Sequence, residues 1–147
     1  MAYAELKTLG LLSCTSEKAS YPCKVSEMYL RSNLFRKAIS YAKKHYDLIA
    51  ILSAKYGLLL LDEVIEPYNE TLNDKGTQEI KAWSAKVFEQ MKSKLDLKVI
   101  SVIYFHAGEK YRKYLVPHIE AVHIKCEVPL EGFRIGEQLQ WYDQQCR

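Results

Sequence analysis

The sequence predicts an α/β fold, a three-layer sandwich in which helices cover both faces of a mainly parallel, roughly four-stranded sheet. Short apolar runs alternate along the chain with segments of helical periodicity, which is the order expected of parallel α/β proteins. Most of these runs are apolar almost throughout, as in strands that are buried on both faces. No repeat or linker interrupts the order, and a length of 147 residues suits a single domain, 1–147.

Four segments are predicted to be strands. Three are short apolar runs that end in small or polar residues, and the last shows a weaker alternation of apolar and polar positions. In chain order, the predicted strands are Leu6–Cys14, Asp47–Ala54, Lys98–Phe105 and Val122–Val128.

Three helices are predicted from apolar side chains at helical spacing. The first covers residues 32–42, with Ser32 or Asn33 as its N-cap. The second, Thr77–Leu95, is the longest amphipathic segment of the chain. The third is Ile135–Gln145.

Two further segments contain a proline that limits their structure. Leu58–Asp74 shows no clean period and contains Pro67, so we expect a long loop with at most a short helical turn. Glu109–Ile119 is predicted to form a helix that opens at Gly108 and has Pro117 near its end.

The composition narrows the possible classes of protein. Hydrophobic residues make up 48% of the chain and charged residues 27%, as in soluble globular proteins. No run approaches the roughly 18 apolar residues that span a bilayer, so no membrane partner is predicted. Residues 1–7 show no basic patch followed by a long apolar block, so we predict no secretory signal and a cytoplasmic location. A net charge of +3 permits a phosphate-bearing ligand without indicating a DNA-coating surface.

Cysteine spacing and cofactor motifs give no sign of a metal or cofactor. The cysteines of a cytosolic chain are expected to be free thiols rather than disulfides. His118 and His123 have the spacing of a zinc-finger histidine pair, but no closely spaced cysteine pair precedes them. Neither G-x-x-x-x-G-K-[ST] nor G-x-G-x-x-G occurs, so we predict no cofactor.

Small, hydroxyl-bearing or ionisable residues follow each predicted strand, at the carboxyl ends where parallel sheets bind ligands. In chain order these residues are Ser13, Cys14, Thr15 and Lys18; Ser53, Lys55, Tyr56 and Gly57; His106, Gly108 and Glu109; and Glu131, Gly132 and Gly136. Loops are polar in any case, and Gly57 can simply provide a positive φ, so structural packing remains an alternative for each cluster. The four clusters together favour a pocket.

Several motifs resemble a known family. They are S-C-T at 13–15, I-L-S-A-K-Y-G-L-L at 51–59, P-Y-N-E-T-L at 67–72, H-A-G-E-K-Y at 106–111, P-L-E-G at 129–132 and I-G-E-Q-L at 135–139. Together they resemble an uncharacterised bacterial and phage family, a domain-of-unknown-function group distantly similar to the YaaA peroxide-stress proteins and to a core domain of archaeosine synthase. The resemblance implies nucleobase or nucleic-acid chemistry. The chain departs from the family pattern at Ser16, where many members carry lysine, and at Arg134, where a small residue is expected.

Carboxylates and one thiol are the candidates for catalysis. Cleavage of an N-glycosidic bond needs a carboxylate beside the sugar, and Glu109, near a predicted strand end, is the first candidate. Glu70, in the P-Y-N-E-T-L loop, is the second. Cys14 is a candidate nucleophile beside Lys18, although a buried core thiol is the alternative.

The remaining candidates are assigned to ligand binding. The helix openings at Gly108 and after Gly132 would bind an anion, a lysine or arginine would neutralise a phosphate, and a tyrosine would stack on a base. His106 is either a ligand contact or a core histidine with satisfied hydrogen bonds. The predicted ligand-binding residues are Ser13, Thr15, Lys18, Ser53, Lys55, Tyr56, Gly57, Tyr68, His106, Gly108, Gly132, Arg134 and Gly136.

Two functions from different classes are compatible with these residues. The first is an enzyme that cleaves or transfers at the N-glycosidic bond of a nucleotide or modified base. The alternative is a non-catalytic accessory protein of phage or stress response that binds nucleotides or nucleic acid. Its expected partner is a small nucleotide or nucleobase, with nucleic acid as a further candidate. An enzyme should lose turnover when Glu109 becomes glutamine, whereas a binding protein should depend more on Lys55.

Overall fold

The computed structural model describes residues 5–146, which form a mixed α/β fold. The strands of its main sheet are β1 (Lys7–Ser13), β3 (Leu48–Ser53), β4 (Gly57–Leu60), β6 (Ile100–His106) and β7 (Lys125–Glu127). Their order is β4-β3-β1-β6-β7, and only β4 is antiparallel to its neighbour. The prediction of a mainly parallel α/β sheet is confirmed, but the sheet has five strands rather than four.

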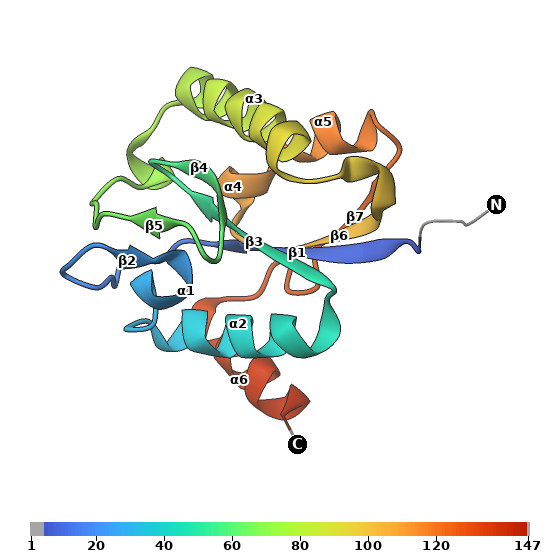
Figure 1. The fold of residues 1–147 in the computed structure, drawn as a ribbon. Helices are drawn as coiled ribbons and strands as arrows, with labels where there is room; N and C mark the ends of the chain where they lie inside the picture. Colours follow the sequence, from blue (N-terminus) through green and yellow to red (C-terminus); the bar gives the residue numbers. More distant parts are fainter. Residues whose placement is uncertain (1–4, 147) are drawn as a thin grey trace.

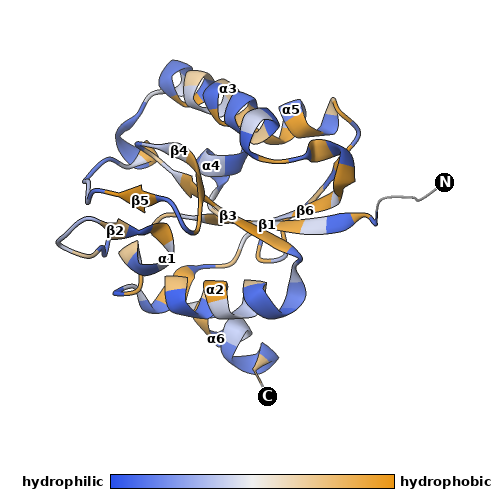
Figure 2. Ribbon diagram, in the orientation of Figure 1, coloured by the Kyte–Doolittle hydropathy of each residue, from blue (hydrophilic) through white to orange (hydrophobic). Residues whose placement is uncertain are grey.

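Helices lie on both sides of this sheet. The main helices are α2 (Asn33–His45), α3 (Thr77–Lys94), α5 (Val116–Glu120) and α6 (Ile135–Gln145). Figure 1 shows α3 and α5 on one side and α2 and α6 on the other. Hydrophobic residues are concentrated in the central strands, whereas the helices are mixed (Figure 2). Each side therefore has its own buried core, one around Met91 and Phe105 and the other around Phe35 and Ile51.

A small second sheet and several short helices complete the fold. β2 (Cys23–Lys24) and β5 (Val64–Ile65) pair as a two-stranded antiparallel sheet. The short helices are α1 (Val25–Met28), η1 (Leu72–Asp74), η2 (Leu97–Val99) and α4 (Glu109–Arg112). Residues 1–4, on which the predicted absence of a secretory signal partly depends, lie outside the described residues.

The additional strand exists because the chain reverses after β3 instead of entering a long loop. Gly57 pairs with Ser53 in an antiparallel hairpin and has a φ of +79°, a left-handed conformation that favours glycine. A Cβ at this position would also collide with the Gln90 side chain. The prediction of a loop over Leu58–Asp74 is therefore wrong for β4 and β5. The short helical turn that was expected within this loop is η1.

The outer side of β4 is covered by side chains. The Leu58 N–H donates to Gln90 Oε1 over 2.8 Å, and the Leu58 carbonyl accepts from Lys94 Nζ over 2.7 Å. The Leu60 N–H donates to Glu63 Oε2 over 2.6 Å, and the Leu60 carbonyl accepts from the Glu63 N–H over 3.2 Å. An ion pair of 3.0 Å joins Lys94 to Glu63. Three side-chain bonds and one backbone bond thus occupy the groups that a further strand would use.

The helices agree with the prediction except around Pro117. Of the two predicted N-caps for α2, Ser32 is the one observed, because its Oγ accepts from the Phe35 N–H over 3.2 Å. The helix predicted over Glu109–Ile119 is divided into α4 and α5, since Pro117 has no N–H to continue a helical ladder. The fourth predicted strand is shorter than expected because the chain turns at His123, whose φ is +64°.

No helix within residues 5–146 has both the length and the apolar composition to cross a membrane. In the same described part of the chain, no group of three or more histidine, cysteine, aspartate or glutamate side chains is arranged to hold a metal ion. The four cysteines are free thiols, as predicted.

Candidate functional site

The adjacent parallel strands β1 and β6 mark the point where the strand order reverses. The chain leaves β1 for β3 by way of α2, and it leaves β6 for β7 by way of α5 on the opposite face of the sheet (Figure 1). In open α/β sheets, the crevice beside such a reversal is the usual place for a ligand. Two adjoining cavities open at the carboxyl ends of these two strands.

The first cavity has a volume of about 390 Å³ and lies at the end of β6. Its walls come from the beginning of α2, the loop after β6 and the turn after β7. Leu34, Phe35 and Phe133 supply apolar surface. Polar and charged side chains on its walls include Ser13, Thr15, Glu109, Arg112, Glu131 and Gln138.

The second cavity has a volume of about 540 Å³ and lies at the end of β1. Ser13, Thr15 and Leu34 line both cavities, so the two form one continuous groove. Ionisable side chains that line the second cavity but not the first are Cys14, Glu17, Lys18, Glu70 and Tyr111. The groove therefore places one candidate carboxylate, Glu109 or Glu70, in each of its halves.

His106 forms part of the first cavity and is fully hydrogen-bonded. Its Nε2 lies 2.5 Å from Tyr46 Oη, and its Nδ1 lies 2.7 Å from Tyr142 Oη. Burial lowers the pKa of His106 to about 4, so the ring is neutral at pH 7. A neutral imidazole has one donor and one acceptor nitrogen, and both are occupied here. This arrangement fits the alternative of a core histidine with satisfied hydrogen bonds. A Cβ at Gly10 would collide with the Tyr46 ring, so glycine in β1 makes room for this network.

Arg112 also lines the first cavity, and the backbone holds its guanidinium in place. Its Nε donates to the Ala107 carbonyl over 3.3 Å, and its Nη1 lies 3.8 Å from Glu131 Oε1. The Arg112 side chain is 17% exposed, whereas that of Glu131 is 69% exposed. A pair with such an exposed partner is weak, so Arg112 keeps donors for a bound ligand.

Cys14 lines the second cavity together with the phenol of Tyr111 and the ammonium group of Lys18. Its Sγ is 3.6 Å from Tyr111 Oη, which also accepts from the Leu72 N–H over 3.5 Å. Burial raises the pKa of Tyr111 to about 12, so the phenol keeps its hydrogen at pH 7. Burial lowers the pKa of the Lys18 ammonium, and the nearby Cys14 partly offsets this effect.

A buried hydroxyl cluster lies behind the second cavity. The hydroxyl oxygens of Tyr29 and Tyr68 are 2.6 Å apart, and Ser53 Oγ donates to Tyr68 Oη over 2.8 Å. Ser53 Oγ also accepts from the Tyr56 N–H over 3.0 Å, and Lys18 Nζ lies 4.5 Å from the centre of the Tyr68 ring. Burial raises the pKa of both tyrosines, so all three hydroxyls keep their hydrogens. Three hydroxyl hydrogens serve two bonds within the cluster, which leaves one without an acceptor there.

The structure brings most of the predicted site residues to the groove. Those that line one or both cavities are Ser13, Cys14, Thr15, Lys18, Glu70, His106, Gly108, Glu109 and Gly132. Ser53 and Tyr68 contribute to the buried hydroxyl cluster instead. Arg134 and Gly136 lie at the start of α6 and line neither cavity.

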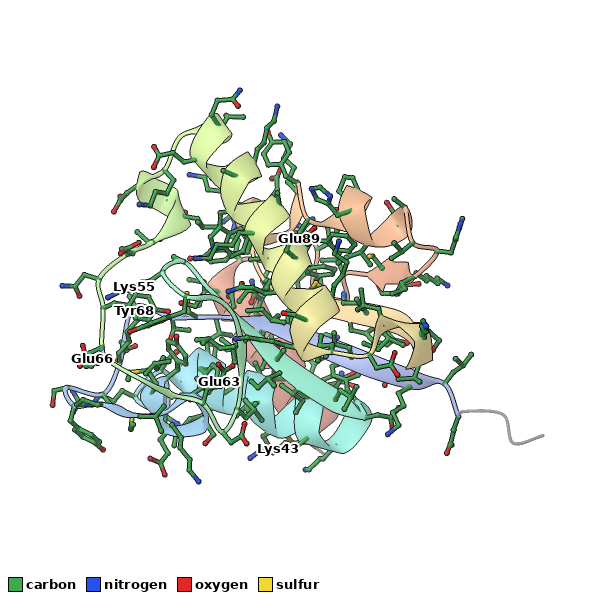
Figure 3. All side chains as sticks on the ribbon, turned by 45° about the horizontal axis from the view of Figure 1, so that its top comes forward. Lys43, Lys55, Glu63, Glu66, Tyr68 and Glu89 are labelled. Atoms are coloured by element: carbon green, nitrogen blue, oxygen red, sulfur yellow. The ribbon has the colours of Figure 1, made fainter. Side chains whose placement is uncertain are left out.

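The hairpin residues Lys55, Tyr56 and Gly57 do not reach the groove, because the chain turns back into β4 at this point. The hydroxyl of Tyr56 accepts from the Glu66 N–H over 3.3 Å, and its ring packs edge-on against Tyr68. Lys55 is exposed at the hairpin turn (Figure 3). It lines a third, smaller hollow.

Sequence reasoning missed Tyr111 and Arg112 as groove residues. A signal for Arg112 was present, since residues three apart in a helix share a face and Glu109 precedes it by three. Tyr111 belongs to the H-A-G-E-K-Y motif but had no assigned role. Its contact with Cys14 depends on how β1 and α4 meet, which no local pattern specifies.

A mostly parallel sheet with a groove at its reversal point defines an α/β protein of the doubly wound class, in which ligands bind beyond the carboxyl ends of the strands. The chain belongs to a family of unknown function, DUF6884, whose model matches residues 9–144. This range contains every motif on which the family resemblance was based. None of the curated proteins matches the chain.

Proposed function

We propose that this protein is an enzyme that cleaves or transfers at the N-glycosidic bond of a nucleotide or modified base. The observation that carries the proposal is the continuous groove at the sheet reversal, with a carboxylate in each half and the hydroxyls of Ser13 and Thr15 between them. The resemblance of the groove motifs to proteins of nucleobase chemistry supports the same substrate class.

The first cavity suits a base. Leu34, Phe35 and Phe133 offer apolar surface for its flat faces, while Arg112 and Gln138 offer donors for its polar edge. Ligand pockets commonly combine apolar surface with polar groups that fix orientation, in volumes of roughly 300–1,000 Å³. A cavity of about 390 Å³ lies within that range.

The second cavity suits the sugar and its phosphate. Lys18 provides a cation, and the first turn of α2 contributes Asn33 and Leu34 to the wall. Backbone N–H groups at a helix N-terminus favour an anion, and here the lysine adds to that preference. Ser13 and Thr15, at the boundary of the two cavities, are then positioned for the sugar hydroxyls.

The chemistry requires a carboxylate near the bond between sugar and base. That bond breaks with its electrons leaving on the base, which takes up a proton, and water or a second acceptor forms the new bond to the sugar carbon. Glu109, in the cavity assigned to the base, is the first candidate to stabilise the positive charge that develops on the sugar or to position water. Glu70, in the adjoining cavity, is the second.

One observation favours a second candidate function, a binding protein without catalysis. Glu109 and Glu70 are both exposed, and His106 has no free ring nitrogen to serve as an acid or base. A binding protein needs the shape and donors of the groove but no positioned acid or base.

Release of free base distinguishes the two functions. The pure protein is incubated with nucleosides, nucleotides and short single-stranded oligonucleotides, and free base is followed by mass spectrometry. Glu109→Gln should reduce base release by about 10²- to 10⁴-fold with little loss of ligand binding, since the amide keeps the shape of the side chain. The matched control is Glu89→Gln, because Glu89 is exposed on α3 (Figure 3) and, among residues 5–146, forms an ion pair only with Lys92.

Two outcomes would contradict the enzyme. Absence of base release from every substrate, combined with measurable ligand binding, supports the binding protein. Equal loss of activity in Glu109→Gln and Glu89→Gln would remove Glu109 from the chemistry.

A further inference from the structure

A third, smaller space, called the lysine hollow below, lies beside the second cavity. It has a volume of about 260 Å³ and is lined by Lys55, Lys75 and Lys86, together with Glu70 and Trp83. Glu70 lines both this hollow and the second cavity, and the segment 69–75 contributes side chains to both. The groove and the lysine hollow are therefore separated by a single stretch of chain.

The three lysines of this hollow outnumber its two carboxylates, Glu70 and Glu79, by one. Within the described residues, neither Lys55 nor Lys86 has a carboxylate oxygen within ion-pair distance. Lys75 Nζ lies 3.9 Å from Glu70 Oε2 and 4.0 Å from Glu79 Oε2, and both carboxylates are largely exposed. Such exposed pairs stabilise little, so the ammonium groups remain available for a phosphate-bearing partner.

Aromatic rings lie close to several lysine ammonium groups, in the hollow and elsewhere on the protein. Lys55 Nζ lies 5.3 Å from the centre of the Tyr56 ring, and the Trp83 indole forms part of the hollow itself. Elsewhere, Lys81 on α3 and Lys113 lie 5.3 and 5.5 Å from the centre of the Tyr114 ring. Cations interleaved with aromatic rings are typical of surfaces that bind single-stranded nucleic acid through its phosphates and its bases.

We infer that the lysine hollow binds the phosphate backbone of a single-stranded nucleic acid, one nucleotide of which enters the groove. A free nucleotide would fill the two cavities and leave Lys55 and Lys86 without a partner. A polynucleotide continues past the segment 69–75 and engages them. If the proposed function holds, the nucleotide that enters the groove is also the one whose base is released; this part of the inference rests on that function.

The test measures binding of a fluorescein-labelled single-stranded oligonucleotide of about 12 nucleotides by fluorescence anisotropy at several salt concentrations. The variant is Lys55→Gln combined with Lys86→Gln. The matched control is Lys43→Gln combined with Lys44→Gln, because these exposed lysines lie on α2, and Lys43 is well apart from Lys55 in Figure 3. The slope of log K against log salt is negative, and removing two phosphate contacts should make it shallower by about 1.4. The Kd should rise roughly three- to tenfold near physiological salt, and the control should match the wild type.

Base release from a mononucleotide and from the oligonucleotide is measured in parallel. Loss of oligonucleotide binding with unchanged base release from the mononucleotide supports both the hollow and the proposed function. Lysine-dependent binding without base release from any substrate supports the hollow and contradicts the proposed function. Unchanged affinity and salt slope in the double variant, or tighter binding of a duplex than of the single strand, overturns the inference, whatever the base release shows.

Discussion

Each half of the groove adjoins a network of tyrosine hydroxyls at the ends of parallel strands, but the central groups of the two networks are held by contacts of different length. In the first cavity, His106 has both nitrogens on tyrosines, at 2.5 and 2.7 Å. In the second, Tyr111 Oη lies 3.6 Å from Cys14 Sγ and accepts from the Leu72 N–H over 3.5 Å. Short bonds on both nitrogens fix the ring of His106, whereas long contacts on the wall of a cavity can change when a ligand arrives.

The difference teaches that residue type alone does not identify a reactive group. His106 and Tyr111 both occur in the motif H-A-G-E-K-Y, and histidine is the more common catalytic residue. Yet His106 is 9% exposed with no free nitrogen, whereas Tyr111 is half-buried on the wall of a cavity. Three predictions test this contrast between a structural and a responsive network.

The largest effect is expected for His106→Phe. The substitution leaves the hydroxyls of Tyr46 and Tyr142 without their partner, and each unsatisfied buried group costs about 1–3 kcal/mol. We expect the free energy of unfolding at pH 7 to fall by about 3 to 4 kcal/mol, measured by urea denaturation. The control His118→Phe changes an exposed ring stacked on Phe88 and should cost less than about 0.5 kcal/mol. A similar small cost for His106→Phe would show that its network is not structural.

A slightly smaller loss in the free energy of unfolding is expected when the pH is lowered. The pKa of His106 is about 4 in the folded protein against an ordinary value of 6.5, so the unfolded chain binds the proton more tightly. The stabilisation from the neutral ring is fully present above pH 6.5 and is lost as the pH falls toward 4. A shift of this size corresponds to about 3 kcal/mol. Urea denaturation at a series of pH values should show this loss in the wild type, on top of the loss from carboxylates, and His106→Phe should lack it.

The smallest effect is expected for Tyr111→Phe. The hydroxyl makes two long contacts, with Cys14 Sγ and the Leu72 N–H, and water can reach the cavity to replace them. We expect a loss of about 1 kcal/mol in the free energy of unfolding. A loss as large as that of His106→Phe would mean that the second network is as structural as the first.

The sequence predicted the main elements because each has its own local signal. The apolar run of β1, the N-cap at Ser32 and the periodicity of α3 are all readable without tertiary contacts. The hairpin was missed because Leu58–Leu60 continues the apolar run of β3, and only Gly57 indicates the turn between them. The division of α4 from α5 was missed although Pro117 was visible, since a proline near a helix end is often tolerated.

The groove was predictable where it depends on strand ends and not where it depends on packing. Ser13 and Glu109 come together because β1 and β6 are parallel neighbours, which follows from the predicted fold class. The same rule misplaced Lys55, because it assumes that the chain continues into a crossover helix rather than a hairpin. The saturation of His106 was not predictable, since it depends on tyrosines 60 and 36 residues away in sequence.

The covered side of β4 limits how copies of this protein can associate. An exposed edge strand offers unpaired N–H and C=O groups on which the strand of another molecule can add, a common route to aggregation. The outward groups of Leu58 and Leu60 are already bonded to Gln90, Lys94 and Glu63. β7, at the opposite edge, is only three residues long. Extension of the sheet from one molecule into the next is therefore hindered at both ends, which leaves the helices and the groove as the surfaces open to other molecules.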